Sequence, residues 1–190
     1  MVKSITFCAL LLIFSNTIQL KRGETVQNIV SRNVIVETGI SRSAGIVLST
    51  GIVLSTFHSL DVGYGVTVNG KEAKIVLVRP DLDLMILLVE TEEMEQVRFA
   101  DVAEIGTEVI TVGNPAMKTG VVSFGRIVYA DENTLITDTL AMHGFSGGGV
   151  YTTDGVLIGM IQRMYGSKNG GSWVTSSIRS ALIVKALEGQ

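Results

Sequence analysis

Ser146 is the residue in this sequence whose surroundings most suggest chemistry. It lies in the stretch 142–150, with Gly144 before it and three consecutive glycines directly after it. A run of glycines indicates a backbone with unusual dihedral angles, or one that another group approaches closely. If that group is a peptide carbonyl, the amides of Gly144 and Ser146 can bind the oxyanion that forms when the serine hydroxyl attacks it. The other interpretation is a glycine-rich hairpin loop without chemistry.

A nucleophilic serine needs a general base, and the base needs an acidic group that orients it. The chain has two histidines, and one of them, His58, closes an apolar, strand-like run. Asp83 opens a second such run. The order His58, Asp83, Ser146 suggests a triad in which the imidazole takes the serine proton while the aspartate fixes and stabilises the ring. This chemistry needs no metal and no cofactor.

Five short motifs follow one another along the chain. They are a strand pair that ends at His58, an Asp-Leu-Met-Ile-Leu run from Asp83, a Gly-Asn-Pro turn at 113–115, a Thr-Gly-Val-Val strand from 119, and Thr-Asp at 137–138 ahead of the Gly-x-Ser-Gly-Gly loop. Together, in this order, they resemble the chymotrypsin-fold (trypsin-like) serine peptidases, and within them the HtrA/Deg-like branch. The resemblance extends from about Val34 to the C-terminus.

The resemblance implies an all-β fold of two antiparallel six-stranded β-barrels with a cleft between them. His58 and Asp83 would lie on one wall and Ser146 on the other, with the amides of Gly144 and Ser146 as the oxyanion hole. The implied activity is that of a serine endopeptidase, which cleaves unfolded or extended polypeptide through an acyl-enzyme. We expect the peptidase domain alone, because the 190 residues leave no room for the PDZ module that many HtrA proteins carry.

Short strand candidates separated by glycine, asparagine and aspartate support this architecture. The strand-like pattern begins at Val26, within a peptidase domain that we expect over residues 23–190. We predict the first barrel over about 26–92, the second over about 100–176 and a C-terminal helix over 177–188.

Three smaller signals refine these elements. Ser176 or Ser177 is a candidate N-cap of the closing helix. The dipeptide Asn69-Gly70 predicts a tight hairpin. The acidic stretch 90–95 is expected to be a solvated linker between the barrels.

Three further residues compete for roles near the site. Asp81 is an alternative acid, but it follows Pro80 and is expected in a solvated turn, whereas the apolar run starts directly after Asp83. His143 lies three residues before the serine and is expected at the rim of the cleft, because no strand or acid positions it. Asp138 is expected to be a structural hydrogen-bonding residue near the loop.

The resemblance also indicates a substrate pocket. The residue six positions before the serine, here Leu140, forms the base of the pocket for the side chain that precedes the cut (P1). An apolar floor disfavours lysine and arginine, since burying their charge is costly, so we expect small or medium aliphatic P1 side chains. Met160, Ile161 and Gln162 would form the flanking edge where an extended substrate adds as a strand, and His143 would line the rim.

Two positions depart from the pattern of the family. Phe145 occupies the position before the serine, where asparagine or aspartate is usual, and Gly149 replaces a common proline. We expect Phe145 to change the packing beside the pocket and Gly149 to let the loop flex.

Composition limits the partners and the compartment. With 46% hydrophobic residues the chain can bury a sizeable core. A net charge of -3 without a basic cluster argues against a nucleic-acid partner. Cys8 is the only cysteine, so no intramolecular disulfide can form. The expected partner is a polypeptide substrate, with homo-oligomers also open.

The N-terminal residues 1–22 are expected to be a signal peptide or, if uncleaved, a membrane anchor. Lys3 precedes a short apolar run over 5–14, which is shorter than the ~18 to 20 residues of a spanning helix. We therefore expect export to the periplasm, the cell envelope or the medium, with membrane contact only through this leader.

Two other functions remain open at this stage. A catalytically silent module could keep the barrels to bind extended peptides, and a structural component of a larger assembly could use them as a scaffold. The intact set of His58, Asp83 and Ser146 favours the enzyme.

Overall fold

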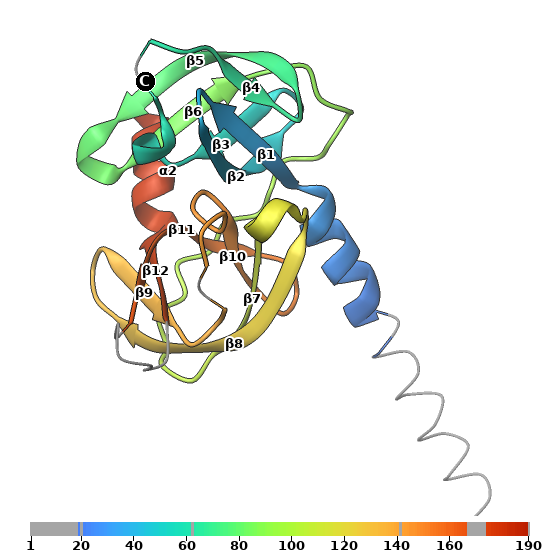
Figure 1. The fold of residues 1–190 in the computed structure, drawn as a ribbon. Coiled ribbons are helices and arrows are strands. Elements are labelled where there is room, and N and C mark those ends of the chain that lie inside the picture. Colours follow the sequence, from blue (N-terminus) through green and yellow to red (C-terminus); the bar gives the residue numbers. More distant parts are fainter. Residues whose placement is uncertain (1–18, 20, 62, 141, 167–173, 190) are drawn as a thin grey trace, which may run out of the picture.

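Runs of β-branched and aliphatic residues, separated by glycine, asparagine and aspartate turns, form two closed antiparallel barrels of six strands each (Figure 1). The computed structural model describes residues 19, 21–61, 63–140, 142–166 and 174–189. The fold class predicted from the sequence is confirmed. The expected leader over 1–22 lies almost entirely outside the described residues. Of the helices in the described ranges, none is long and apolar enough to cross a membrane.

The first barrel closes because its first strand pairs with both its second and its fourth strand. Its strands are β1 (Asn33–Thr38), β2 (Ser41–Ser49), β3 (Ile52–Ser55), β4 (Val66–Val68), β5 (Lys71–Arg79) and β6 (Leu84–Leu88). Their order around the barrel is β1-β2-β3-β6-β5-β4. The predicted hairpin joins β4 to β5, and Asn69 and Gly70 have φ values of 50° and 80°, as a tight turn of this kind requires.

The second barrel repeats this connectivity, because β7 pairs with both β8 and β10. Its strands are β7 (Glu108–Gly113), β8 (Val121–Ala130), β9 (Thr134–Thr137), β10 (Gly149–Thr152), β11 (Leu157–Tyr165) and β12 (Val174–Arg179). The acidic stretch 90–95 contains no helix or strand and connects the two barrels, as predicted.

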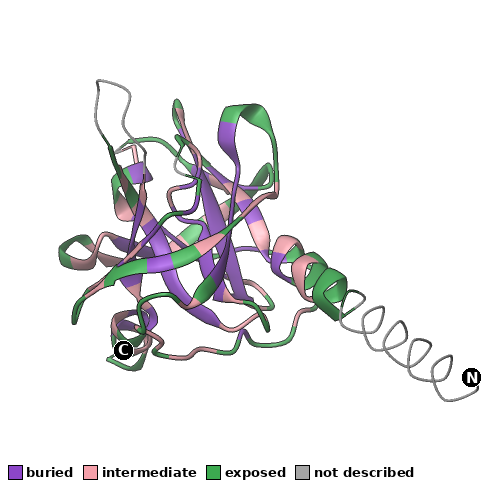
Figure 2. Ribbon diagram, turned by 90° about the horizontal axis from the view of Figure 1, so that it is seen from below, coloured by how far each residue is buried: buried purple, intermediate pink, exposed green. Residues whose placement is uncertain are grey.

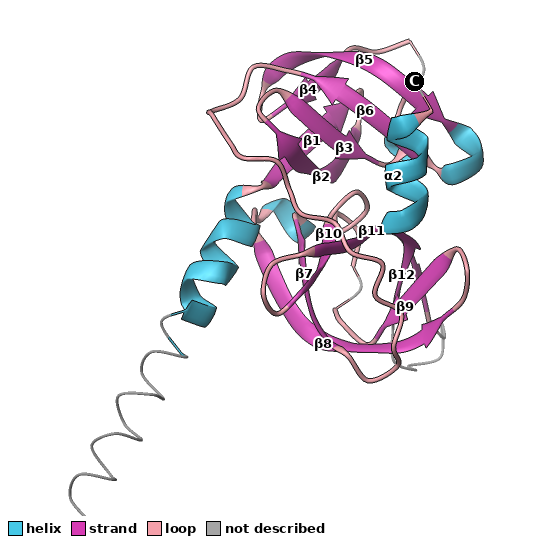
Figure 3. Ribbon diagram, turned by 180° about the vertical axis from the view of Figure 1, so that it is seen from behind, coloured by secondary structure: helices cyan, strands magenta, loops and turns pink. Residues whose placement is uncertain are grey.

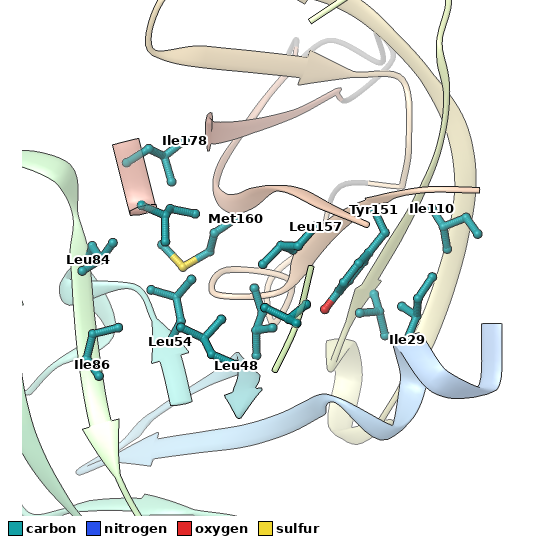
Figure 4. Packing of buried hydrophobic residues seen from close by; sticks show 14 residues of the cluster. Ile29, Leu48, Leu54, Leu84, Ile86, Ile110, Tyr151, Leu157, Met160 and Ile178 are labelled. Atoms are coloured by element: carbon teal, nitrogen blue, oxygen red, sulfur yellow. The ribbon is translucent and has the colours of Figure 1, made fainter. Parts of the chain in front are cut away.

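A shared apolar core lies between the barrels (Figure 4). Leu54 and Leu84 from the first barrel pack with Met160 and Ile178 from the second. In Figure 2 the buried residues concentrate on the strands, whereas the turns are mostly exposed. Because the two barrels share one core, loops at their junction are held in a defined relation to each other.

Residues 21–31 form a helix, so the prediction of strands from Val26 onward is wrong. Val26, Ile29 and Val30 recur at helical spacing, and this face packs against the core between the barrels. Figure 1 shows the helix projecting from the junction of the barrels. The first strand therefore begins only at Asn33.

The C-terminal helix, α2 (Ser180–Glu188), begins later than the predicted position 177. Ser176 and Ser177 do not cap it, because they belong to β12 and pair with Ile136 and Leu135 of β9. Arg179 ends that strand and is the N-cap residue of the helix. Figure 3 shows α2 beside the junction of the two barrels, on the side away from the helix over 21–31.

Candidate active site

His58 lies in a single 3-10 turn, η1 (Phe57–Ser59), which directly follows β3. Asp83 contacts it twice, since Oδ1 accepts the backbone N–H of His58 at 2.8 Å and Oδ2 lies 2.7 Å from Nδ1. This double contact fixes the ring and leaves Nε2 as the nitrogen that can face a nucleophile. The Asp83 side chain is 15% exposed and the His58 side chain 46%. The acid is therefore shielded, while the ring remains accessible.

Asp83 has a left-handed backbone, with φ 49° and ψ 49°, at the end of the 3-10 turn η2 (Pro80–Leu82). Aspartate tolerates this conformation better than most residues, because its short polar side chain can bond locally. The alternative acid, Asp81, instead pairs with Arg79 at 2.7 Å. The hydrogen bond from Arg79 lowers the pKa of the Asp81 carboxyl below its ordinary value. The structure thus joins Asp83, and not Asp81, to His58.

The backbone before Ser146 forms a tight turn. The Phe145 N–H donates to the Met142 carbonyl at 3.2 Å, and Gly144 within this turn has φ +96°. A side chain at Gly144 would also meet the Asn114 carbonyl oxygen at 2.4 Å, so only glycine fits here. Among the described residues, neither the Gly144 nor the Ser146 N–H has an acceptor. These are the two donors that the resemblance assigns to the oxyanion hole.

The glycines after the serine allow the loop to contact the first barrel. A Cβ at Gly147 would lie 2.0 Å from the Ala44 carbonyl oxygen, and the Ala44 N–H donates to the Ser146 carbonyl at 2.8 Å. Gly149 begins β10 and pairs with Met160, and a Cβ there would lie 2.3 Å from the Tyr151 ring. The Phe145 ring is buried against Gly113 and forms part of the second barrel's core.

The Ser146 hydroxyl faces the second barrel in this structure. Its Oγ donates to the Gln162 carbonyl over 3.4 Å, a long contact, and no hydrogen bond joins the described side chains of His58 and Ser146. Two of the three predicted side chains are thus paired on one barrel. The third is held on the facing barrel by a weak hydrogen bond.

A small pocket of about 30 Å³ lies beside the serine. Its walls come from the serine loop, from β11 and from β12, and consist of Met142, His143, Phe145, Ser146, Ile161, Arg163, Met164 and Thr175. His143 is an exposed residue of this lining, and Ile161 lines it as well. The contributions of Arg163, Met164 and Thr175 were not predicted, although the first two directly follow the predicted edge residues 160–162.

Leu140 does not form the floor of this pocket. Thr137 and Thr139 turn inward and bond with the Thr175 hydroxyl in a buried cluster, with 2.8 Å between Thr139 and Thr175. Since side chains alternate along an extended chain, Leu140 turns outward and is 43% exposed. Asp138, which also turns outward, accepts the Arg126 N–H at 2.5 Å and so has the structural role expected of it.

The predicted substrate edge is shifted along β11. Met160 pairs with β10 and is fully buried in the core between the barrels, so it cannot contact a substrate. Gln162 lies at a bulge, and its side chain donates to the Leu82 carbonyl on the first barrel at 2.6 Å. From Arg163 onward, β11 pairs with β12 on one side only among the described strands. The open edge therefore begins beyond Gln162.

No metal site accompanies these residues in the part of the chain that the structure describes, where no three His, Cys, Asp or Glu side chains are grouped to hold an ion. The described residues thus provide a hydroxyl, a carboxylate-bound imidazole and two amides without an acceptor among them. This set is suited to nucleophilic attack on a carbonyl with general base assistance.

Known proteins resemble the chain in sequence and in fold. A model of the trypsin-like peptidase domain matches residues 37–160, which include all three predicted catalytic residues. No curated protein sequence matches the chain.

Solved structures share the fold. A serine endoprotease from Yersinia pestis superposes with a TM-score of 0.78 at 24% identity over 88% of this chain, which spans 65% of that chain's length. The inactive form of the Rv3671c protease gives a TM-score of 0.76 at 20% identity, with 90% of this chain and 94% of that one covered. An inactive mutant of Rv3671c from M. tuberculosis H37Rv gives 0.73 at 20% identity, with 87% and 89% covered.

Proposed function

The chain belongs to the trypsin-like peptidase family of serine endopeptidases, and we propose that it hydrolyses peptide bonds through a triad of His58, Asp83 and Ser146. The observation that carries the proposal is the double contact of Asp83 with the His58 backbone and ring. A carboxylate that only stabilised the turn would need only the contact with the backbone N–H of His58. Holding Nδ1 as well selects the tautomer whose Nε2 can accept a serine proton.

In the proposed reaction, His58 Nε2 takes the proton of Ser146 as Oγ attacks the carbonyl carbon of the substrate. The N–H groups of Gly144 and Ser146 donate to the resulting oxyanion. The imidazolium then gives its proton to the leaving amine, and an acyl-enzyme on Oγ remains. Water, deprotonated by His58, attacks the acyl carbon, and return of the proton to Oγ frees the carboxylic acid. Asp83 stays charged throughout.

The Ser146 hydroxyl has to exchange its present partner for His58. Its contact with the Gln162 carbonyl is 3.4 Å long and therefore weak. Hydrogen bonds at catalytic sites are often long or absent without substrate and tighten in the complex. We expect a bound peptide to complete the hydrogen bond between the serine and the histidine.

The proposed substrate is an extended polypeptide that adds as a strand to the open edge of β11 beyond Gln162. Its P1 side chain would enter the small pocket, where Phe145, Ile161 and Met164 supply apolar walls. Small or medium aliphatic P1 residues suit the small size and apolar walls of this pocket better than bulky or charged ones. The basis of this preference is thus different from the Leu140 floor expected from the sequence.

The test is digestion of an unfolded protein such as reduced casein, with sequencing of the products. We expect cuts mainly after alanine, valine or other aliphatic residues with the wild type, and no cuts with Ser146→Ala. Cleavage mainly after lysine or arginine would contradict the proposed pocket. Equal cleavage by Ser146→Ala would contradict the proposed nucleophile.

A silent peptide-binding module is the second candidate, and one observation favours it. Ser146 has no hydrogen bond to His58 among the described contacts and instead faces Gln162. In that case the chain would bind an extended peptide at the same edge without cleaving it. Binding of a fluorescent unfolded peptide without turnover, together with no reaction towards a fluorophosphonate, would support this candidate over the enzyme.

A further inference from the structure

Asn114 is a buried polar residue that the proposed mechanism does not use. It follows β7 and precedes the 3-10 turn η3 (Pro115–Met117), and it is 2% exposed. A buried amide is costly unless its donors and acceptors are satisfied. Its partners therefore indicate what the residue holds in place.

The side chain of Asn114 joins the two barrels. Its Nδ2 donates to the Val34 carbonyl of β1 at 2.8 Å, and its Oδ1 accepts the Asn33 Nδ2 at 2.6 Å. The same Oδ1 accepts the Gly120 N–H at 3.0 Å, which closes the loop that contains η3. One amide thus connects a strand of the first barrel with both ends of a loop on the second.

The backbone of Asn114 contacts the serine loop at the turn that offers the oxyanion donors. Its N–H donates to the Gly144 carbonyl at 2.8 Å. Because the next N–H, that of Phe145, is bound to Met142, both ends of the Gly144–Phe145 peptide are held. The Asn114 carbonyl also lies against the Gly144 Cα, at the position where a Cβ would clash.

The loop after Asn114 adopts an unfavourable conformation. Ala116 and Met117 have φ values of 48° and 63°, in the left-handed region that side chains other than glycine rarely occupy. Consecutive residues of this kind persist only when surrounding contacts determine the backbone. The two hydrogen bonds from Asn114 to Val34 and from Gly120 to Asn114 are such contacts, since they fix both ends of the loop.

We propose that Asn114 is a positioning residue, which holds the Gly144 turn in its oxyanion-binding conformation. It also couples that conformation to the packing of the two barrels against each other. The inference deepens the proposed function and rests on it for the catalytic consequence. At 2% exposure, Asn114 is shielded from direct contact with a bound peptide. It acts through the Gly144 peptide, whose orientation it fixes.

The test compares three variants with the wild type. Asn114→Asp keeps the shape but loses the donor to Val34. Asn33→Ala removes only the 2.6 Å bond to Oδ1. Ser180→Ala is the matched control, because Ser180 is also buried and its hydroxyl donates to the Ala100 carbonyl in a different part of the junction.

The first readout is hydrogen–deuterium exchange of the segment 142–148, measured by mass spectrometry. We expect about tenfold faster exchange in Asn114→Asp, a smaller increase in Asn33→Ala and none in Ser180→Ala. The second readout is the split between kcat and KM, together with inhibition by a peptide aldehyde, whose hemiacetal oxygen occupies the oxyanion site. In Asn114→Asp we expect kcat to fall about 10- to 100-fold, aldehyde affinity to fall in parallel and KM to stay nearly constant.

A folded Asn114→Asp protein with wild-type exchange in 142–148 and wild-type kcat would overturn the proposal. So would a Ser180→Ala protein that loosens this segment to the same extent. If Asn114→Asp does not fold, the test rests on Asn33→Ala. Wild-type exchange of the segment 142–148 in that variant would then overturn the proposal. If the wild type shows no peptidase activity but the exchange differences are as expected, the proposed function fails while the role of Asn114 in the turn stands.

Discussion

The side-chain amide of Gln162 on the second barrel donates a 2.6 Å hydrogen bond to the carbonyl of Leu82 on the first barrel. Leu82 ends the turn that leads directly into Asp83, while the backbone carbonyl of Gln162 accepts the hydroxyl of Ser146. One residue therefore connects the segment that carries the acid with the segment that holds the nucleophile. Its side chain and its backbone have separate roles, which substitution can distinguish.

Replacement of Gln162 by alanine should slow the reaction without unfolding the protein. Loss of one hydrogen bond between neutral groups is worth about 1 kcal/mol, so kcat/KM should fall about 3- to 10-fold if this bond helps to position Asp83. Steady-state kinetics on a peptide substrate measures the effect. Gln96→Ala is the control, because Gln96 is an exposed glutamine just after the linker. An equal loss there would contradict the positioning role.

The two aspartates near η2 should respond differently to neutralisation. Asp83→Asn removes the acceptor that selects the histidine tautomer, and kcat should fall by about 10,000-fold. Asp81→Asn removes only the exposed pair with Arg79, and its kcat should stay within about twofold of the wild type. The comparison needs one assay at neutral pH. A large loss in Asp81→Asn with little change in Asp83→Asn would reverse the assignment of the acid.

Alternation and turn chemistry made most of the fold predictable. The Asn69-Gly70 hairpin and the strands around His58 and Asp83 follow from local residue preferences. The helix over 21–31 was missed because its apolar residues, Val26, Ile29 and Val30, are β-branched and resemble the start of a strand. Only their spacing of three and four, and the core they pack against, identify a helix.

The sequence predicted the site only where the order of the motifs along the chain indicates which residues lie close together. The contact between His58 and Asp83 joins the ends of two consecutive motifs, and the resemblance placed them together. The contacts of Asn114 and Gln162 with the opposite barrel depend on how the barrels pack, which no local pattern encodes. Leu140 was assigned to the pocket by its offset from the serine, yet the inward Thr139 determines that Leu140 turns outward.

The size of the P1 pocket should depend on Met164. Met164→Ala enlarges the lining, so substrates with leucine or phenylalanine at P1 should gain about 10-fold in kcat/KM relative to alanine, since filling an apolar pocket is worth ~1–3 kcal/mol per group. A peptide library with varied P1 residues measures this shift. Leu140→Ala is the control and should leave the preference unchanged. A P1 preference that changes in Leu140→Ala but not in Met164→Ala would show that Leu140, and not Met164, lines the pocket.

Asp131 should contribute a pH-dependent part of the stability. Its Oδ1 accepts the N–H groups of Asn133 and Thr134 at 2.9 and 2.8 Å, and these bonds lower the pKa of the carboxyl. Because the folded pKa lies below the ordinary value of about 3.9, the stabilisation is complete above that pH and is lost as the pH falls through the folded pKa.

The variant Asp131→Asn makes this contribution measurable. In urea denaturation at about pH 6, the wild type should be more stable than the variant, and the difference should shrink as the pH falls below about 3.9. A difference that stays constant or grows in acid would show that the charge of Asp131 is not its source.

Covalent labelling of Ser146 tests the central claim most directly. A biotinylated fluorophosphonate reacts with a serine whose proton a neighbouring base removes and whose oxyanion site is formed. Intact-mass and peptide mapping should find one adduct per chain, on Ser146, with labelling lost in both Ser146→Ala and His58→Ala. A folded wild-type protein that takes up no label, or that carries the label on another residue, would contradict the account.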